Sequence, residues 1–247
     1  HPLGVNYWQT LIGAVLLISY LVATRQSLPL GRNYLSFYLI CGFLGSVVPG
    51  LLYFYAIMHI SPGVLAITIA TVPIMTYIAA ALMKVEVTSI LRLLGVCCGV
   101  LSILLLIVPT ESLPDRSAVF WVFAAIAAAA CYTGENLIIA IRLPQGSNAF
   151  IVLGGMLITA TLIMTPFVFI TGTFVPLSWP WGTSAWAIIS LAFLNVVCYG
   201  LFIMLIVRAG AVFASQTAYI VTLSGVFWGI LIFGEEHSLW IWASLVS

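Results

Sequence analysis

Charged residues are scarce in this sequence. Its 247 residues include only 7 Lys or Arg and 6 Asp or Glu, or 5% of the chain, against about 25% in an ordinary soluble domain. So few charges cannot cover the surface of a water-soluble globule, and 64% of the residues are hydrophobic. This composition excludes a soluble enzyme, a nucleic-acid-binding protein and a disordered chain. The formal net charge of +1 also supplies no field that would attract nucleic acid. The composition favours a polytopic membrane protein whose apolar surface is solvated by lipid.

Familiar catalytic and cofactor-binding motifs are also lacking. The sequence has no Gly-rich loop followed by Lys, so we expect no ATP motor in this chain. It has no His-Glu-x-x-His motif, no Ser/His/Asp set and no paired intramembrane Asp. The five cysteines lie inside apolar runs without metal-ligand spacing, and we interpret them as buried small hydrophobes. We therefore expect no cofactor, no metal and no enzymatic activity.

Long apolar runs, separated by short polar breaks, make up most of the chain. Each full run is long enough to cross a hydrocarbon core of about 30 Å as a helix. Runs such as 101–108 lack the alternation of polar and apolar residues that transmembrane β-strands show. We predict an all-α polytopic helix bundle. The predicted spans are 6–24, 34–58, 63–84, 90–109, 117–141, 148–171, 184–207 and 211–234, with a truncated span at 238–247.

Basic residues concentrate in alternate breaks, which predicts the orientation of the spans. One set of breaks holds six of the seven Lys and Arg residues, and the other holds only Arg116. Because basic loops face the cytoplasm, we predict that the first set is cytoplasmic. Seven of the eight tryptophans fall at the opposite helix ends or in the loop near 172–183, where indole rings anchor to the headgroup boundary. We expect a multi-pass protein of the plasma membrane, such as a bacterial inner membrane.

A sparse internal repeat appears when the chain is shifted against itself by about 150 residues. The shift spans five predicted membrane crossings, and because five is odd, the second copy must be inverted relative to the first. Inverted repeats are typical of secondary transporters, in which the two halves enclose a site near the bilayer midplane. The matched pairs include Phe43 with Phe193, Gly50 with Gly200, Thr68 with Thr217 and Glu86 with Glu235.

Two segments, one in each half of the chain, carry similar short motifs. The first runs from Tyr53 through Ser61-Pro62-Gly63 and Val72-Pro73 to Glu86, and the second runs from Arg208 to Gly234-Glu235. These segments resemble the EamA family of the drug/metabolite transporter superfamily. The resemblance implies a ten-helix fold of two inverted five-helix repeats. It also implies transport of amino acids, other metabolites or drugs, often as export, with a proton as one potential coupling ion. The sequence departs from the family pattern at two points: Val85 replaces the Gly before the first Glu, and Thr222 stands where the second repeat would have a proline.

The resemblance also predicts the domain organisation. Residues 1–110 form the first repeat, which lacks its first helix, and residues 117–247 form the second repeat, whose last helix is truncated.

Glu135 is the acidic residue that lies well inside an apolar run. It shares one helical face with Tyr132 and Asn136 by i, i+3 and i+4 spacing. A charge at this depth is costly and usually faces a cavity or a partner. On one interpretation Glu135 binds a substrate amine or a coupling proton, and on the other it is a protonated or paired structural carboxyl.

Further polar residues near mid-membrane are candidates for substrate binding, although ordinary hydrogen bonding between helices would also explain them. They comprise three pairs at helical spacing and one further aromatic residue in the first predicted repeat. Two prolines inside spans are candidate hinges, because proline kinks a helix and frees a carbonyl group. We interpret Glu86 and Glu235, which lie at span ends, as helix-end hydrogen-bonding groups. The binding candidates are Gln216 with Tyr219, Asn195 with Tyr199, Thr68 with Thr71, and Tyr53; the hinge candidates are Pro49 and Pro73.

These observations favour a secondary transporter that moves a small metabolite by alternating access around a midplane cavity. The alternatives are an intramembrane enzyme, which needs several convergent ionisable groups at depth, and a non-transporting membrane scaffold, which needs no polar midplane. The expected partners are a small-molecule substrate and the lipid bilayer, with a possible coupling proton and no nucleic acid. The sequence leaves the substrate, the direction, the coupling ion and the oligomeric state open.

Overall fold

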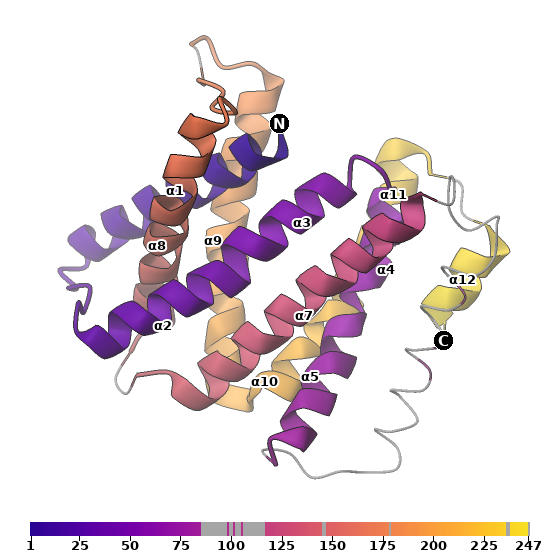
Figure 1. The fold of residues 1–247 in the computed structure, drawn as a ribbon, viewed down its shortest axis with the longest axis horizontal. Helices are drawn as coiled ribbons and strands as arrows, with labels where there is room; N and C mark the ends of the chain where they lie inside the picture. Colours follow the sequence, from indigo (N-terminus) through magenta and orange to yellow (C-terminus); the bar gives the residue numbers. More distant parts are fainter. Residues whose placement is uncertain are drawn as a thin grey trace. The chain divides into compact units, whose positions relative to one another are not determined.

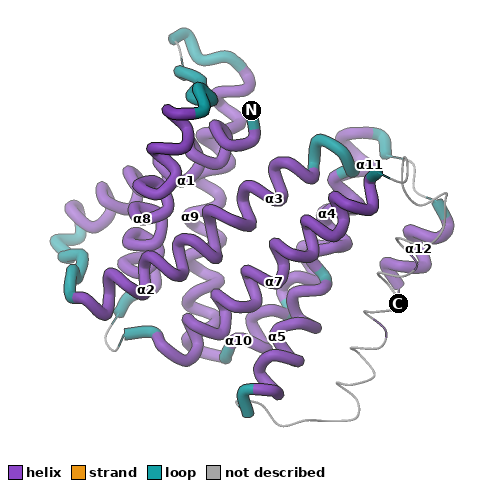
Figure 2. The backbone as a smooth tube through the Cα atoms, viewed as in Figure 1, coloured by secondary structure: helices purple, strands orange, loops and turns teal. Residues whose placement is uncertain are grey.

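The computed structural model describes residues 1–84, 98, 101, 105, 117–144, 147–177, 179–235 and 238–246. Every regular element in this part of the chain is helical (Figures 1 and 2). Glu86 lies outside the described residues, and so does the predicted span 90–109 except for residues 98, 101 and 105. The elements are α1 (Pro2–Ala23), α2 (Arg32–Gly42), the π-helical segment η1 (Phe43–Val47), α3 (Val48–Ala56), α4 (Pro62–Ile69), α5 (Thr71–Leu82), α7 (Ala118–Arg142), α8 (Ala149–Ile170), α9 (Thr183–Ala209), α10 (Ala211–Ser215), α11 (Thr217–Phe233) and α12 (Leu239–Val246).

Seven spans in the described part of the chain are long and apolar enough to cross a membrane, and they confirm seven of the predicted spans. Three of them are composite: α2, η1 and α3 form one, α4 and α5 another, and α10 and α11 a third. The spans are Pro2–Ala23, Arg32–Ala56, Pro62–Leu82, Ala118–Arg142, Ala149–Ile170, Thr183–Ala209 and Ala211–Phe233.

The helix ends use the turn chemistry present in the sequence. Ser61 and Asn148 cap α4 and α8, because their side-chain oxygens accept hydrogen bonds from Val64 N and Phe150 N at 3.4 and 3.0 Å. Gly234 ends α11 in the left-handed conformation at φ 64°, which glycine adopts without steric cost. These local signals explain why the observed ends fall close to the predicted ones.

The chain forms two compact units, and each combines segments from both halves of the sequence. Unit 1 comprises His1–Phe54 and Ile138–Gly210, and unit 2 comprises Tyr55–Leu137 and Ala211–Ser247. The predicted repeats, 1–110 and 117–247, are divisions along the chain, whereas the units are divisions in space. The repeat boundaries stay a prediction.

In unit 1, α1 packs against α8 and α9, and α2 packs against α8. A buried apolar cluster, which includes Leu3, Tyr7 and Met164, forms part of this core. The contacts between α1 and α8 show that the two helices run antiparallel, because early residues of one meet late residues of the other. These contacts join Gly4 to Thr173, Asn6 to Met164 and Gly154 to Leu17.

In unit 2, α4 packs against α11, and α5 packs against α10. The hydroxyl of Thr222 in α11 donates to Ala66 O in α4 at 2.9 Å, and Val72 in α5 shares an apolar cluster with Ala218. The two composite spans therefore lie side by side and antiparallel. The internal repeat matches these two spans to each other, through Thr68 and Thr217, so their packing agrees with the predicted inversion.

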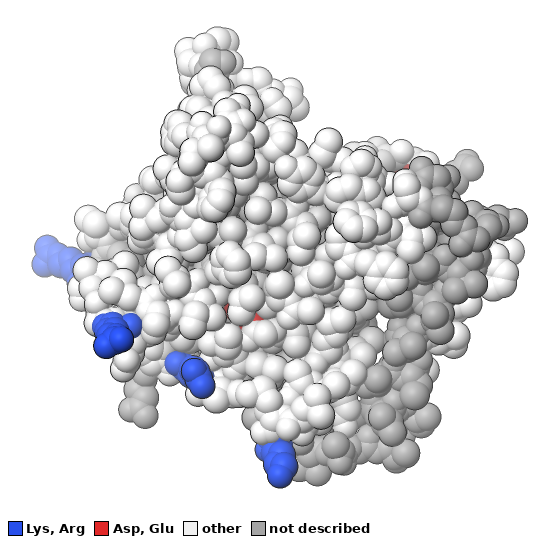
Figure 3. Space-filling model, viewed as in Figure 1, with Lys and Arg blue, Asp and Glu red and all other residues white. Residues whose placement is uncertain are grey.

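Charged side chains are sparse on the face shown in Figure 3. All five described Lys and Arg residues are exposed and lie at or next to helix ends; they are Arg25, Arg32, Lys84, Arg142 and Arg208. This is the distribution that a membrane-spanning bundle requires, because charged groups at helix ends can reach water and headgroups.

Candidate functional site

The predicted polar face of α7 belongs to unit 2. Tyr132 packs against the apolar cluster of Val72, Ala129 and Ala218, which brings α5, α7 and α11 together. Glu135 is 0% exposed and Asn136 is 1% exposed. The sequence-predicted face is thus buried among protein groups rather than presented to lipid.

A hydroxyl pair links this face to α5. The side chains of Thr76 and Thr133 lie within hydrogen-bonding distance of each other, at 3.4 Å, and both are buried. Thr133 Oγ1 also donates to Val72 O at 3.5 Å. Thr133 is three residues before Asn136, so the two residues lie on one side of α7.

Asn136 has one polar atom, its side-chain oxygen, that the described part of the fold does not use. Its side-chain oxygen is buried and has no hydrogen-bond partner among the described residues. A buried amide oxygen without a donor is costly, and such groups in native structures call for an explanation such as a bound ligand.

Thr68 and Thr71 are buried, but their hydroxyls are used locally. Thr68 Oγ1 donates to Leu65 O, and Thr71 Oγ1 donates to Thr68 O, both at 2.6 Å. These bonds flank the break between α4 and α5 at Ala70, where the helix leaves carbonyl groups without their usual partners. The geometry favours the structural interpretation of this pair, and substrate contact stays a prediction.

Gln216 and Tyr219 lie at the break between α10 and α11. Gln216 occupies the junction itself and is exposed, and Tyr219 is 42% exposed. The amide of Gln216 donates to Val212 O at 3.4 Å. Both side chains are accessible, unlike Glu135 and Asn136, and their contact with a substrate stays a prediction.

Tyr53, Asn195 and Tyr199 belong to unit 1, whereas the other seven predicted binding residues belong to unit 2. All three are half-buried. The ring of Tyr199 lies 6.3 Å from that of Phe202, one turn further along α9. Within unit 2, the cluster of Val72, Ala129 and Ala218 brings Tyr132 of α7 together with α5 and α11.

Both predicted hinge prolines lie beside a helix irregularity. Pro49 is the second residue of α3, which directly follows the π-helical segment η1, and Pro73 lies three residues after the break at Ala70. Proline cannot donate to the preceding turn and its ring crowds that turn, which explains the position of each irregularity. Hinge motion at these sites stays a prediction.

The break between α10 and α11 has no proline, and the sequence analysis did not predict it. Instead, three consecutive side chains bond to carbonyl groups of their own helix: Ser215 and Gln216 to Val212 O, and Thr217 to Ala214 O. Such bonds compete with the helical backbone pattern and bend helices. The run Ser-Gln-Thr inside an apolar span is the sequence feature that could have predicted this break.

Asn6 is a second residue that the sequence analysis missed. It is buried in α1, and its Nδ2 donates to Ser46 O at 3.1 Å and to Val47 O at 3.4 Å. Both carbonyls belong to η1, so Asn6 clamps the π-helical segment that precedes Pro49. An asparagine at the start of an apolar run is the sequence feature that could have pointed to this role.

Glu235 has the helix-end role predicted for it, although it acts on a different helix. Its carboxylate accepts from Gly63 N at 3.1 and 3.4 Å and so caps the N-terminus of α4, where a negative charge is favoured.

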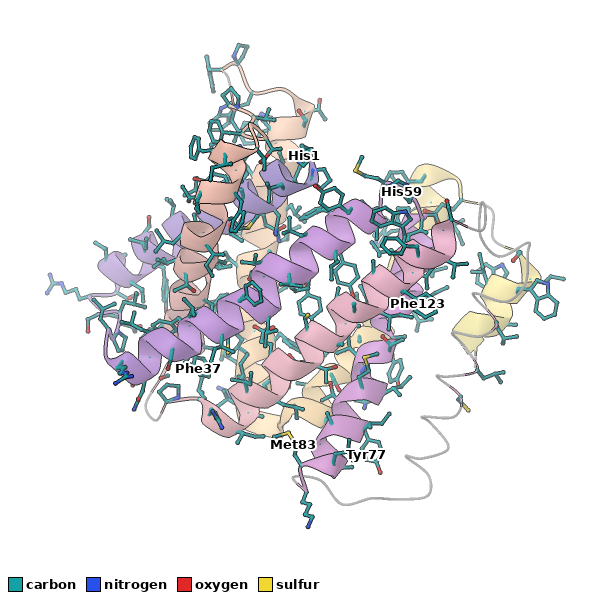
Figure 4. The ribbon with its side chains drawn as sticks, in the orientation of Figure 1. His1, Phe37, His59, Tyr77, Met83 and Phe123 are labelled. Atoms are coloured by element: carbon teal, nitrogen blue, oxygen red, sulfur yellow. The ribbon has the colours of Figure 1, made fainter. Side chains whose placement is uncertain are left out.

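His59, labelled in Figure 4, lies in the turn before α4 and stacks on Trp121 of α7 with ring centroids 4.1 Å apart.

The fold and the buried polar face define a polytopic helical membrane protein in which two composite spans of unit 2 pack side by side and antiparallel. Residues 1–108 match the model of the EamA-like transporter family. This match confirms the resemblance to the EamA family for that part of the chain, and with the seven apolar spans it supports a transporter of the drug/metabolite type.

One solved structure, described as "Crystal structure of protein", is similar over 99% of this chain and 84% of its own, with a TM-score of 0.70 and 16% sequence identity. At this identity the likeness shows the fold alone. No curated protein matches the sequence.

Proposed function

We propose that this protein is a secondary transporter in the plasma membrane that exports a small organic metabolite by alternating access. The main support is the antiparallel packing of the two composite spans in unit 2, α4 with α5 and α10 with α11. Many secondary transporters use interrupted helices from two inverted repeats, and bind substrate where those helices break.

The buried face of α7 supplies the polar groups that this function needs. We assign Glu135 to contact with the substrate or a coupling proton, with Tyr132 and Asn136 beside it on the same face. Glu135 lies seven residues before Arg142, or about 10 Å along the helix. A carboxyl group at this depth is costly to retain, which favours a functional role.

The two alternatives fit the described residues less well. An intramembrane enzyme needs several convergent ionisable groups at depth, and among the described spans Glu135 is the one acidic residue found inside a helix. A scaffold that does not transport has no need for a buried carboxyl beside an amide whose oxygen lacks a donor among the described groups.

Counterflow in liposomes tests the function. Purified protein is reconstituted with an internal pool of unlabelled compound, and uptake of the labelled form is measured for a panel of amino acids, amines, carboxylates and neutral metabolites. We expect saturable exchange of at least one compound, which a scaffold or an enzyme would not produce. Failure of every compound in liposomes that contain folded protein would contradict the proposal.

Two matched substitutions then test the assignment of Glu135. A charge-assisted hydrogen bond contributes about 1.5–3 kcal/mol, so Glu135→Gln should lower exchange by about tenfold or more. Glu235→Gln, the same change at the carboxylate that caps α4, should leave exchange near the wild-type rate. If Glu135→Gln retained both the wild-type rate and its dependence on pH, neither the substrate role nor the proton role would stand.

A further inference from the structure

We infer that the π-helical segment η1 is a latched hinge, in which the side-chain amide of Asn6 in α1 fixes the direction of α3. The inference rests on the proposed function, because alternating access needs hinges at defined residues, and it specifies one hinge and the group that controls it. The boundary between the two compact units falls after Phe54, within α3. The direction of α3 therefore determines where the chain leaves unit 1.

The first argument is the backbone pattern around η1. At its start Phe43 N donates to Leu39 O, four residues back, whereas after its end Val48 N donates to Phe43 O, five residues back. The helix is therefore wider by one residue over this turn, a geometry that is rare overall but frequent at functional sites. Pro49, the second residue of α3, has no N–H group, so no backbone hydrogen bond donated from this position opposes bending.

The second argument is that the two halves of this span are held unequally. A Cβ atom added at Gly42 in α2 would lie 2.5 Å from Met156 O in α8, which shows how closely these helices approach. Thr159 Oγ1 of α8 also donates to Tyr38 O of α2 at 2.9 Å. Among the described elements, the principal contacts of this span with other helices are made by α2 and η1, and α3 is not among them. The half-helix α2 is thus fixed on α8, whereas α3 depends on contacts close to η1.

The third argument is the position of Asn6, which touches both sides of the hinge. It is 2% exposed, and its Nδ2 donates to Ser46 O at 3.1 Å and to Val47 O at 3.4 Å, with Met164 Sδ 3.6 Å away. A Cβ atom added at Gly50, in the first turn of α3, would overlap the same amide. One side chain of α1 therefore joins the last carbonyl groups of η1 to the start of α3, and release of its bonds would free α3 to change direction.

Hydrogen exchange of the purified protein in nanodiscs, followed by mass spectrometry, tests the latch. Asn6→Ala removes the amide and should raise the exchange rates of backbone amides in Phe43–Ala56 by about tenfold, the effect of losing buried hydrogen bonds. Amides of α9, which lies away from η1 on α1 and α8, should keep their rates. Asn33→Ala makes the same change at an exposed position of α2 and should leave all rates near those of the wild type.

A side chain that only stabilised the fold would give a different pattern. Loss of global stability raises exchange through opening of the whole unit, so the rates in α8 and α9 would rise together with those in η1 and α3. A uniform rise across unit 1 in Asn6→Ala would overturn the inference, as would unchanged rates in Phe43–Ala56.

Gly50→Ala tests the latch while Asn6 is still present. The new methyl group would displace the amide from the two carbonyl groups, so the local rise in exchange should match that of Asn6→Ala. The double variant should exchange little faster than either single one, because both lose the same bonds and coupled sites are not additive. Gly154→Ala, whose Cβ would make an ordinary contact with Leu17 at 3.6 Å, is the matched control and should leave exchange near η1 unchanged. Additive effects of the two substitutions would contradict the inference.

The inference and the proposed function fail through different results. A local rise in exchange without counterflow of any compound would support the latched hinge and contradict the transport function. Counterflow by a protein whose Asn6→Ala variant shows no local rise would leave the transporter standing and overturn the latched hinge.

Discussion

At the scale of single residues, two adjacent glycines of α8 meet very different surroundings. A Cβ atom added at Gly154 would lie 3.6 Å from Leu17 Cβ, an ordinary contact. A Cβ atom added at Gly155 would lie 2.6 Å from the ring of Tyr38. Tyr38 is only 1% exposed, so its ring has little room to move. Gly155 therefore permits the close packing of α2 on α8, whereas Gly154 does not limit it.

Gly155→Ala should destabilise unit 1, because the new methyl group overlaps the buried ring of Tyr38. Overpacking of this kind costs about 1–3 kcal/mol. Gly154→Ala is the matched control and should be neutral or slightly stabilising. Unfolding by denaturant in micelles measures both variants, and equal stability of the two would contradict this account of the packing.

Asn6 contributes to the same unit by satisfying the carbonyl groups of η1. Asn6→Leu keeps the approximate size of the side chain but removes both hydrogen bonds to Ser46 O and Val47 O. We expect a loss of about 1–3 kcal/mol in unfolding free energy, because buried carbonyls then lack these donors.

The control for this variant is Asn33→Leu, which makes the same change at an exposed position of α2 and should alter stability by less than about 0.5 kcal/mol. Both are measured by denaturant unfolding. If Asn6→Leu were as stable as Asn33→Leu, the clamp on η1 would have no energetic role.

At the scale of helices, the sequence predicted positions well and irregularities only in part. Prolines 49 and 73 indicated kinks, and a π-helical segment and a break lie beside them. The break before Thr217 depends on side-chain hydrogen bonds within the helix. Serine, glutamine and threonine side chains can also hydrogen-bond to groups on other helices. The run Ser-Gln-Thr alone therefore did not distinguish a break from a straight helix.

The start of α4 depends on a residue more than 170 positions away. Glu235 and Ser61 both accept from backbone N–H groups of its first turn. Loss of a capping side chain costs about 0.5–2 kcal/mol, so Glu235→Ala should lower the unfolding free energy by about 1 kcal/mol. Glu235→Gln, whose amide oxygen still accepts, should lower it by less.

Denaturant unfolding of both Glu235 variants checks this prediction. Unit 2 contains α4, so the transition should shift to lower denaturant concentration in Glu235→Ala. Equal losses for the two variants would show that the negative charge, rather than the accepted hydrogen bonds, holds α4.

At the scale of the whole molecule, the distribution of basic residues predicts which helix ends face the cytoplasm. Gln26 lies in a break next to Arg25, and Pro176 lies in the tryptophan-rich loop after α8. In a cysteine-free background, Pro176→Cys should react with a membrane-impermeant maleimide added to intact cells, and Gln26→Cys should react only after the cells are opened. Equal labelling of both positions in intact cells would contradict the predicted topology.

The sequence alone determined the class and the spans of this protein, and it predicts an inverted order of two repeats. Scarce charge, apolar runs of membrane-crossing length and the odd number of crossings between repeats are properties of the chain itself. The spans follow directly because a backbone in lipid must satisfy its own hydrogen bonds, which leaves long apolar segments little choice but helix.

Tertiary structure decided which segments pack together and which polar groups remain unused. Each compact unit joins segments from both halves of the sequence, since a helix buries its side chains against whichever partner lies beside it, whatever the distance along the chain. Spacing placed Tyr132, Glu135 and Asn136 on one face, but only the packed helices showed that the nearby threonines bond within the protein while the oxygen of Asn136 has no donor among the described groups. Hydrogen-bond partners depend on distances of about 3 Å between segments remote in sequence, and residue patterns along one chain do not contain those distances.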